Sequence, residues 1–401
     1  MIFHIDRNIL LAALQRISYG VATAKKANNT VRGNSIYRCF VFDADCDQLT
    51  IKATDLDVYM SEAVSIGNPN AEKKTFAVEA RPFLRAIKTL ESQNLRIEVL
   101  EYQIIVTHSI GSFAFPLDNN VTIFDTLKEP TISPITAHTL KFEAPGLRSI
   151  LNRCSFAVAD DQLRPVMNGV CLRFTNEFTD FVASDGHRLA RIRKRPMLEC
   201  ESPVDMVMPC QVVSILQAIT PKTGFVEMAF NEFIPQDPNS KEKVPAAVCA
   251  IYMGGVRIVF IPINGRYPNY ISVIPTRFSF DFSVNRQALI KSFERLIQFA
   301  NNSSMLVTVT LTPGFMSMAV EDKDFETKAN ENIPCEYIGG KFRIGFKIPS
   351  LLSILKNLTA PDVTFSIVDA SRAIIIAPKP QPDSEEITML IMPMILNDDA
   401  V

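Results

Sequence analysis

Two hydrophobic patterns alternate along the chain. Segments with apolar residues three and four positions apart predict amphipathic helices, and short β-branched and aromatic runs bounded by Asp, Asn, Gly and Pro predict antiparallel strands. Together they predict the α+β class, with helices gathered on one face of antiparallel sheet. Strands are expected at 37–44, 48–54, 95–101, 103–109, 112–117, 169–174, 179–184, 225–230, 248–253, 256–263, 306–312, 315–320, 363–368, 373–378 and 388–394.

The helical segments recur along the chain. The segment that begins at Ile5 matches another that begins at Phe142 and places Arg16 on Arg153, and a third copy has Arg295 at that position. Each copy has the length of a whole domain, so the sequence predicts three copies of one domain with two helices each. A second helical segment recurs at 76–90, 205–219 and 343–358, and an acidic turn recurs at 53–60, 183–190 and 319–329. The predicted domains are 1–134, 135–276 and 277–401.

Stretches rich in Pro and polar residues mark the expected connections. We expect linkers at 124–136 and 265–278, a solvated insertion at 231–245 and a frayed tail at 397–401.

The composition indicates a soluble, cytoplasmic protein. The chain has 401 residues, of which 47% are hydrophobic, and no apolar stretch long enough to cross a membrane or to form a secretory signal. Its eight cysteines include no CxxC pair, so we expect reduced thiols and no metal site. The net charge of −2 predicts no bulk attraction to nucleic acid, which leaves only a local basic surface for such binding.

Common catalytic motifs, such as GxGxxG, HExxH and GxSxG, do not occur in the sequence. Asp185 and His187 could form the catalytic pair of a hydrolase, or the cluster around them could be a tight turn between strands. The same position in the first copy holds Asp55 and Asp57 without a histidine, which favours the turn. We therefore expect no catalysis and no cofactor. A scaffold that binds no nucleic acid stays open as a further class.

Four segments together resemble the bacterial DNA polymerase sliding clamp family, the beta subunits of the replicative polymerase. They are MNGV at 167–170, ASDGHRLA at 183–190, GRYPNY at 265–270 and LIMPMIL at 390–396. The resemblance covers the whole chain and implies the DNA-clamp fold, in which two chains of three domains join head to tail in a ring. It implies a processivity factor of DNA replication that encircles double-stranded DNA without regard to sequence and has no catalytic step.

Cations on the repeated helices agree with that implication, because helices lining a DNA channel should present Lys and Arg to phosphates without reading bases. The alternative is that these cations form the solvated face of ordinary amphipathic helices. The residues expected to face DNA are Lys26, Arg81, Arg85, Lys88, Arg148, Arg153, Arg164, Lys291, Arg295 and Lys356.

The resemblance also implies a peptide-binding groove between the second and third domains. Its Met-rich walls suit varied apolar side chains. Through it the replicative polymerase alpha subunit, the clamp loader, repair polymerases, ligase and mismatch-repair proteins would dock by short peptide motifs. The matching positions are Met167, Ser184, Gly186, His187, Arg188, Leu189, Pro268, Ser272, Val273, Lys347, Ser350, Leu390, Met392, Pro393, Met394 and Leu396.

For the homodimer, the resemblance implies a contact between Phe113 of one chain and Ile297 and Phe299 of the other. The chain departs from the usual family pattern at Ser272 and Ile395, where basic residues are common. It departs again at Lys347, Ser350 and the pair 165–166, which puts partner preference in question.

Overall fold

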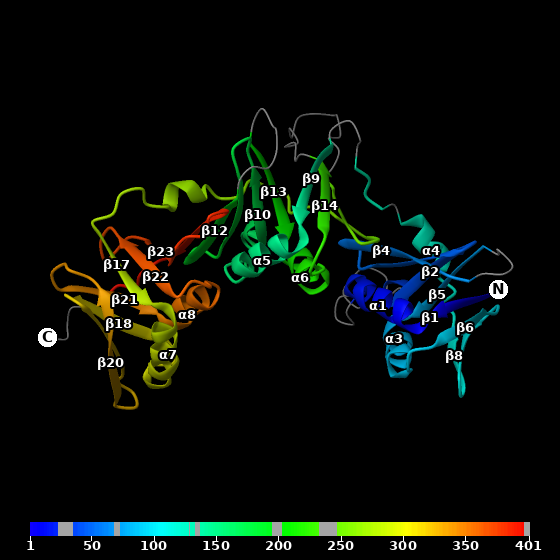
Figure 1. The fold of residues 1–401 in the computed structure, drawn as a ribbon, viewed down its shortest axis with the longest axis horizontal. Helices are drawn as coiled ribbons and strands as arrows, with labels where there is room; N and C mark the ends of the chain where they lie inside the picture. Colours follow the sequence, from blue (N-terminus) through cyan, green and yellow to red (C-terminus); the bar gives the residue numbers. More distant parts are fainter. Residues whose placement is uncertain are drawn as a thin grey trace. The chain divides into compact units, whose positions relative to one another are not determined.

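The computed structural model describes residues 1–22, 35–67, 73–127, 129–132, 137–194, 203–231 and 247–396. Lys26, the insertion that follows Asn231 and the tail 397–401 lie outside the described residues. The chain forms two compact units, each described by itself (Figure 1). Unit 1 comprises Met1–Leu147 and Ala218–Pro262, and unit 2 comprises Arg148–Gln217 and Ile263–Val401.

One order of elements, β-α-β-β-β-β-α-β-β-β, occurs three times and confirms the predicted repeat with two main helices per copy. The first copy is β1 (Ile2–Asp6), α1 (Arg7–Ile17), β2 (Cys39–Asp45), β3 (Gln48–Thr54), β4 (Val58–Ser65), β5 (Lys74–Glu79), α3 (Ala80–Thr89), β6 (Asn94–Val99), β7 (Gln103–His108) and β8 (Gly111–Pro116). A short helix, α4 (Val121–Thr126), follows it.

The second copy is β9 (Ala137–Glu143), α5 (Ala144–Ser155), β10 (Gly169–Phe174), β11 (Thr179–Ser184), β12 (Arg188–Lys194), β13 (Val204–Pro209), α6 (Cys210–Ile219), β14 (Phe225–Asn231), β15 (Cys249–Met253) and β16 (Val256–Phe260). The third is β17 (Phe280–Asn285), α7 (Arg286–Leu296), β18 (Leu306–Thr312), β19 (Phe315–Asp322), β20 (Thr327–Glu336), β21 (Phe342–Lys347), α8 (Ile348–Lys356), β22 (Asp362–Ile367), β23 (Ile374–Lys379) and β24 (Glu385–Ile391).

Several strands are absent from the sequence-based prediction because they run directly into a helix. In the segment expected to begin a helix near Ile5, β1 continues to Asp6 and α1 begins at the next residue. In the segment from Phe76, β5 continues to Glu79 before α3 begins. No turn residue interrupts the hydrophobic pattern at these points, so strand and helix merge into one segment.

Side chains at the strand–helix junctions determine where the first helix of a copy begins. They also hold that helix against the second helix of the same copy. Asp6 caps α1 by accepting hydrogen bonds from the backbone of Asn8 and Ile9, and Asn285 caps α7 in the same way. Arg7 donates to two carbonyl oxygens at the end of α3, and Arg286 donates to Leu355 O at the end of α8 and to Ala360 O in the loop after it. A cation is favourable there because helix C-termini carry partial negative charge.

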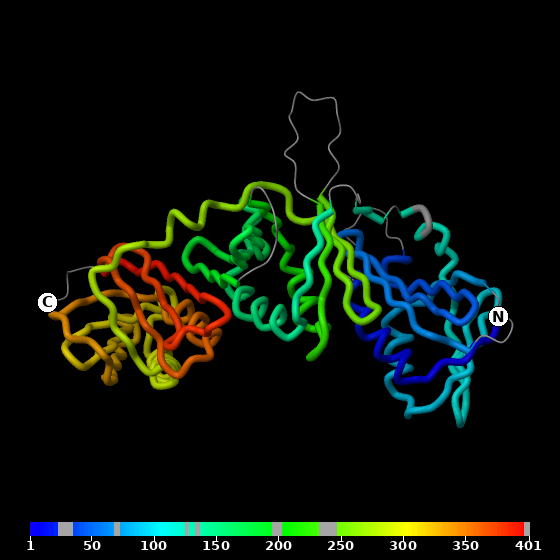
Figure 2. Tube along the Cα trace, turned by 45° about the horizontal axis from the view of Figure 1, so that its top comes forward, coloured from blue at the N-terminus to red at the C-terminus, as the bar shows by residue number. Residues whose placement is uncertain are grey.

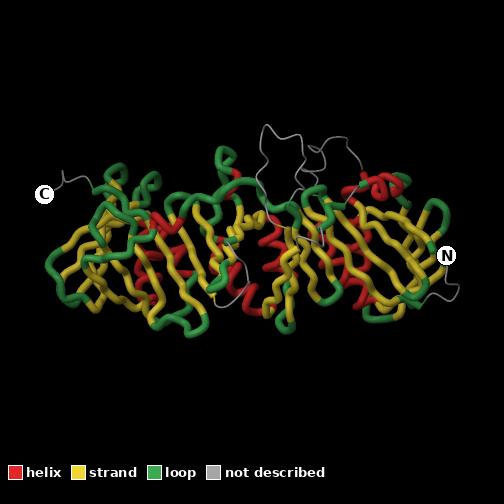
Figure 3. Tube along the Cα trace, turned by 90° about the horizontal axis from the view of Figure 1, so that it is seen from above, coloured by secondary structure: helices red, strands yellow, loops and turns green. Residues whose placement is uncertain are grey.

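The two main helices of each copy cover one face of antiparallel sheet (Figure 3), whereas α4 packs against residues of the opposite face of β2. Unit 1 contains a sheet of order β1-β6-β7-β8 and another of order β5-β2-β3-β4-β16-β15-β14-β9. Unit 2 contains a sheet of order β13-β10-β11-β12-β24-β23-β22-β17-β20-β19-β18-β21. Two pairs therefore join sheets of successive copies, β4 with β16 and β12 with β24.

After its eighth strand, each copy crosses back over its fifth strand at the same place. Asp118 N donates to Ala77 O (2.9 Å), Ile263 N to Val207 O (2.9 Å) and Met394 N to Gly345 O (2.8 Å). After the second crossing, residues 263–279 run along unit 2 towards β17 (Figure 2). The third crossing brings the last described residues onto unit 2, where the predicted groove residues lie.

Candidate functional site

The acidic turn before β12 is built by side-chain to backbone hydrogen bonds. Asp185 Oδ1 accepts from the N–H groups of His187 (2.9 Å) and Arg188 (2.7 Å), and Ser184 Oγ donates to Arg188 O (2.9 Å). Gly186 has a φ of +90°, a conformation that glycine adopts at little cost. The first copy repeats this turn with Thr54 in place of the serine. These contacts support the interpretation as a turn, because both oxygens of the Asp185 carboxylate accept hydrogen bonds, Oδ1 from backbone N–H groups and Oδ2 from the Arg188 side chain.

Arg188 links this turn to the third domain. Its guanidinium donates to Asp185 Oδ2 from Nε (2.9 Å) and from Nη2 (2.6 Å), and to Ser353 Oγ of α8 from Nη1 (2.7 Å). Burial acts against ionisation of Asp185, but hydrogen bonds from Arg188 and His187 outweigh it and lower the pKa of that carboxyl group. The turn is thus fixed to α8 by a charge-assisted contact, which leaves His187 exposed beside it.

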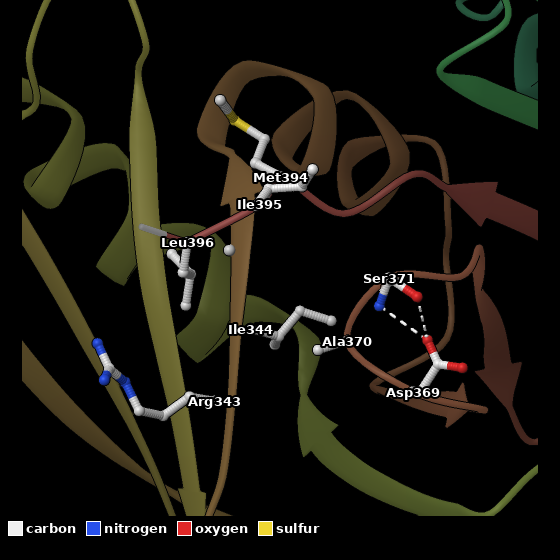
Figure 4. A pocket seen from close by; sticks show the side chains of 9 residues that line it. Arg343, Ile344, Asp369, Ala370, Ser371, Met394, Ile395 and Leu396 are labelled. Atoms are coloured by element: carbon white, nitrogen blue, oxygen red, sulfur yellow. Dashed lines mark hydrogen bonds between the residues drawn. The ribbon is translucent and has the colours of Figure 1, made fainter. Parts of the chain in front are cut away.

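The C-terminal segment carries five of the predicted groove residues, Leu390, Met392, Pro393, Met394 and Leu396. Met392 N donates to His187 O (2.8 Å), which ties the segment to the turn, and the Met392 side chain is 40% exposed. At Gly345 an added Cβ would lie 2.7 Å from Met394 O, so glycine permits the close crossing. The segment Met394–Leu396 lines a cavity of about 370 Å³ together with β21 and the β22–β23 turn (Figure 4). In that view Met394 and Leu396 point in opposite directions from the backbone.

The connection between the second and third domains carries Pro268, Ser272 and Val273 of the predicted groove and is held by a buried network. Asp180 is fully buried and accepts hydrogen bonds from Arg193 (2.7 and 2.8 Å) and from the hydroxyl group of Tyr270 (2.8 Å). Burial, reinforced by Asp180, raises the pKa of Tyr270. These bonds fix the connection, so that Pro268 and Val273 on either side of Tyr270 remain exposed. Sequence reasoning missed Asp180 and Ser353, and neither lies in a motif that would have identified it.

All of the predicted groove residues belong to unit 2. Three of them, Met167, Leu189 and Leu390, are at most 4% exposed. Leu189 and Leu390 are members of a hydrophobic cluster with Tyr267 and Tyr270, so they lie in the core and not at the surface. The half-buried and exposed members are Ser184, Gly186, His187, Arg188, Pro268, Ser272, Val273, Lys347, Ser350, Met392, Pro393, Met394 and Leu396.

Most of the predicted DNA-facing cations lie on helix surfaces. Arg81, Arg85 and Lys88 are exposed along α3, and Lys291 is exposed on α7. The remaining helix cations differ in their surroundings, since Arg148 is half-buried and Lys356 forms an exposed ion pair with Glu294 (2.6 Å).

The expectation that Arg153 faces DNA is wrong. Arg153 is 8% exposed, and its guanidinium pairs with Glu385 (2.7 Å) and donates to Ser149 O. Its counterparts pair in the same way, Arg16 with Glu62 (2.9 Å) and Arg295 with Glu331 (2.6 Å). In all three copies the arginine fastens the first helix to a carboxylate of the sheet, and this shared contact accounts for its recurrence. Arg295 retains an exposed side chain, but its charge is partly compensated.

Arg164 does not lie on a helix. Its Nε donates to Asp161 Oδ2 (2.8 Å), and its guanidinium lies about 3.6 Å from the position that a Cβ on Gly186 would take. The structure therefore places Arg164 beside the candidate groove.

The predicted dimer residues lie at surface positions. Phe113 is half-buried on β8, the edge strand of its sheet, with its ring 4.8 Å from that of His108. Ile297 and Phe299 form the short helix η5 (Ile297–Phe299) after α7, and Phe299 is 43% exposed.

Within the described ranges, no cluster of three or more His, Cys, Asp and Glu side chains is arranged to hold a metal ion. The described helices include none that is both long and apolar enough to cross a membrane.

Three family models match the chain in the order of its copies. The N-terminal domain of the DNA polymerase III beta subunit matches residues 1–124, the central domain matches 141–269 and the C-terminal domain matches 271–395. The chain belongs to the DNA polymerase III beta subunit family. Members of this family are accessory subunits of the polymerase and not its catalytic subunit.

Relatives and solved structures agree with this membership. Proteins named beta sliding clamp are similar over most of their length, with 26% identity over 400 residues for Pseudomonas putida (99% of this chain, 100% of the relative) and 24% over 381 residues for Treponema pallidum (93% and 96%). The sliding clamp of Pseudomonas aeruginosa has the same fold, with a TM-score of 0.84 at 22% identity over 99% of this chain and 100% of that one. Another structure from that organism, bound to griselimycin, has a TM-score of 0.85 at 22% identity, with the same coverage.

Proposed function

We propose that this chain is the processivity clamp of DNA replication, a ring of two copies that encircles duplex DNA and tethers a polymerase. The observation that carries the proposal is the match of all three family models, in order, to a chain whose elements repeat three times. The domain bounds 1–134, 135–276 and 277–401 and a cytoplasmic location are parts of this proposal.

The helix cations support a sequence-independent contact with DNA. Arg81, Arg85 and Lys88 project from one exposed stretch of α3, and no carboxylate occurs within that helix. Such a surface attracts phosphates through charge alone, so binding should weaken steeply with salt and show no base preference.

The ring would close through sheet edges. Among the described strands β8 pairs with β7 alone, and most of the outer edge of β20 has no strand beside it. Exposed edges of this kind favour pairing with another chain. Phe113 on β8 and the residues Ile297 and Phe299 beside β20 would then meet across the interface between copies.

The groove in unit 2 supports docking of short peptides. Met392 and Val273 offer exposed apolar side chains, His187 offers a polar contact, and the bonds of Arg188 and Tyr270 hold the walls in place before a peptide arrives. The polymerase alpha subunit, the clamp loader, repair polymerases, ligase and mismatch-repair proteins would share this site. A relative of the same fold holds griselimycin, so clamps of this fold accept a ligand.

A titration with a fluorescent peptide of the form Gln-Leu-x-Leu-Phe tests the groove. The double variant His187→Ala with Met392→Ala should bind at least tenfold more weakly than the parent, because it removes one exposed apolar anchor and one polar side chain. Phe315→Ala, an exposed aromatic in β19 outside the predicted groove, is the matched control and should bind like the parent. Equal binding by the double variant and the parent would place the partner site elsewhere.

A further inference from the structure

The two sheet junctions within the chain follow one rule, in which the fourth strand of a copy pairs with the eighth strand of the next. The pairing of β4 with β16 begins with Val58 opposite Phe260, and the pairing of β12 with β24 begins with Arg188 opposite Ile391. By this rule β20, the fourth strand of the last copy, lacks an eighth strand among the described strands of its own chain, and β8 of a second chain would supply one. Such a pairing presupposes the dimeric ring proposed above.

The internal repeats also determine the register on the β20 side. Ser184 and Glu321 are equivalent, since each directly precedes the aspartate that caps its turn. Ser184 pairs with Leu189 across its hairpin and Glu321 pairs with Lys328. Lys328 of β20 therefore occupies the position that Leu189 holds in β12.

The same reasoning applies to β8. In the first copy, Ile97, Val106 and Phe113 pair across the strands β6, β7 and β8. The equivalent residues of the third copy, across β22, β23 and β24, are Phe365, Ile376 and Met389. Phe113 is thus equivalent to Met389, and the next residue, Ala114, is equivalent to Leu390.

Within the chain Leu189 pairs with Leu390. Between copies, Lys328 should therefore lie opposite Ala114 of the partner chain. Because the strands are antiparallel, the turn before β20 then lies beside the residues that directly follow β8, Leu117 among them.

The turn before β20 differs from its counterpart in length and in what it exposes. Lys328 is seven residues after its partner Glu321, whereas Leu189 is five residues after its partner Ser184, so the turn before β20 is two residues longer. It carries Phe325, whose side chain is 72% exposed.

The longer turn is held firmly. The buried Asp322 accepts backbone hydrogen bonds from Asp324 (2.9 Å) and Phe325 (3.4 Å), and Asn301 donates to both aspartates (3.3 and 3.1 Å). A large aromatic side chain presented to solvent on a fixed turn is a preorganised contact, which loses little conformational freedom on binding.

The opposite surface, at the end of β8, is a rigid apolar corner. Leu117 N donates to Tyr102 O (2.9 Å), which joins the β6–β7 turn to the end of β8. Tyr102 is 67% exposed, Pro116 is exposed and Leu117 is half-buried. This corner therefore offers an aromatic ring and a proline to a side chain arriving from the partner.

We propose that Phe325 is an intersubunit anchor, which packs against the corner of Tyr102, Pro116 and Leu117 of a second copy of this chain. Each ring closure buries this contact twice, once at each of the two equivalent interfaces. The contact adds to the predicted cluster of Phe113 with Ile297 and Phe299, which would form farther along the same pair of strands, β8 and β20.

A dilution series by analytical ultracentrifugation tests the anchor. Phe325→Ala and Tyr102→Ala should each raise the dimer dissociation constant about tenfold or more, and the double variant should be little weaker than either single variant. Phe315→Ala is the matched control, since it removes a 56% exposed phenylalanine from the strand before the turn and should leave the constant unchanged. If Phe325→Ala kept the dimer dissociation constant of the parent while Phe113→Ala raised it, the proposed anchor would be overturned. The proposal of a dimeric ring would not be affected by that result.

A cross-linking experiment tests whether Phe325 meets this corner, independently of how strongly the two copies associate. Under mild oxidation, Phe325→Cys with Tyr102→Cys should give a covalent dimer, and Phe325→Cys with Ile110→Cys should not, because Ile110 is 92% exposed at the opposite end of β8. Each single variant controls for disulfides formed by the exposed native cysteines Cys46 and Cys210. Equal cross-linking of both pairs would contradict the register, and a parent that stays monomeric at every concentration would contradict the ring itself.

Discussion

At the scale of single residues, sequence patterns identified which positions recur but not always why. Arg16, Arg153 and Arg295 recur at one helix position, and recurrence suggested a shared ligand. The structure shows a shared carboxylate partner instead, contributed by Glu62, Glu385 and Glu331. Sequence spacing could not reveal this, because Glu385 lies in β24 and reaches Arg153 only through folding. Most of the predicted groove residues, in contrast, come from local motifs, and the structure shows most of them at exposed or half-buried positions.

Arg153→Ala should destabilise the protein. Glu385 is 14% exposed and would lose its cationic partner, so we expect the free energy of unfolding to fall by about 1–3 kcal/mol. Lys291→Ala, an exposed cation on an equivalent helix, is the control and should leave thermal unfolding unchanged. Parent-like stability of Arg153→Ala, combined with weakened DNA retention, would restore the discarded DNA-facing role.

Asp185 should contribute a measurable acid sensitivity. Its pKa is lowered in the folded state, so its stabilisation is present above the unfolded pKa of about 3.8 and is lost as the pH falls through the lower folded value. Asp185→Asn should reduce stability by about 1 kcal/mol at pH 7 and flatten the fall in melting temperature between pH 5 and 3. Asp383→Asn, at an exposed turn, is the control; an unchanged acid profile for Asp185→Asn would contradict this role.

At the scale of elements, the alternation of polar and apolar residues predicted the two helices per copy and most strands bounded by turn residues. It failed where a strand meets a helix without a break, as at Asp6 and Glu79. It also missed β4 and β12, which meet no helix and supply the junctions that join successive copies. Those pairings connect residues far apart in sequence, so no local pattern could specify them.

Gly345→Ala should weaken peptide binding through the C-terminal segment. The added methyl group would lie 2.7 Å from Met394 O and 2.9 Å from Leu396 Cδ2, so the segment must move. We expect several-fold weaker binding of the fluorescent peptide with a modest fall in melting temperature. Gly340→Ala, with open space around its Cβ position, is the matched control. Unchanged peptide affinity in Gly345→Ala would show that the crossing does not shape the groove.

The cations of α3 should account for part of the salt dependence of DNA retention. For Arg81→Ala with Arg85→Ala, the slope of log affinity against log salt should fall in magnitude by about 0.9 for each phosphate that the protein no longer neutralises. Lys73→Ala with Lys341→Ala, which removes two exposed cations outside the helices, controls for the change in net charge. An unchanged slope in the α3 double variant would show that this helix does not face DNA.

At the scale of the whole molecule, the proposed function depends on closure of the ring. Each copy of the domain leaves a fourth or an eighth strand for its neighbour, and in one chain β20 and β8 remain without such partners among the described strands. A closed ring holds DNA by topology, so a protein with a net charge of only −2 can be retained without tight binding. Sequence repeats predicted the three copies, but the strand edges that make closure possible became visible only in the folded chain.

The most direct test of the encircling ring is retention on circular and linear DNA of equal length and sequence. The protein is assembled on each DNA with a clamp loader and then separated by gel filtration at moderate salt. Encirclement predicts that it stays with the circle, dissociates from the linear DNA, and leaves the circle when a single restriction cut is made. Equal retention on both DNAs, or retention after the cut, would show ordinary surface binding and would contradict the account.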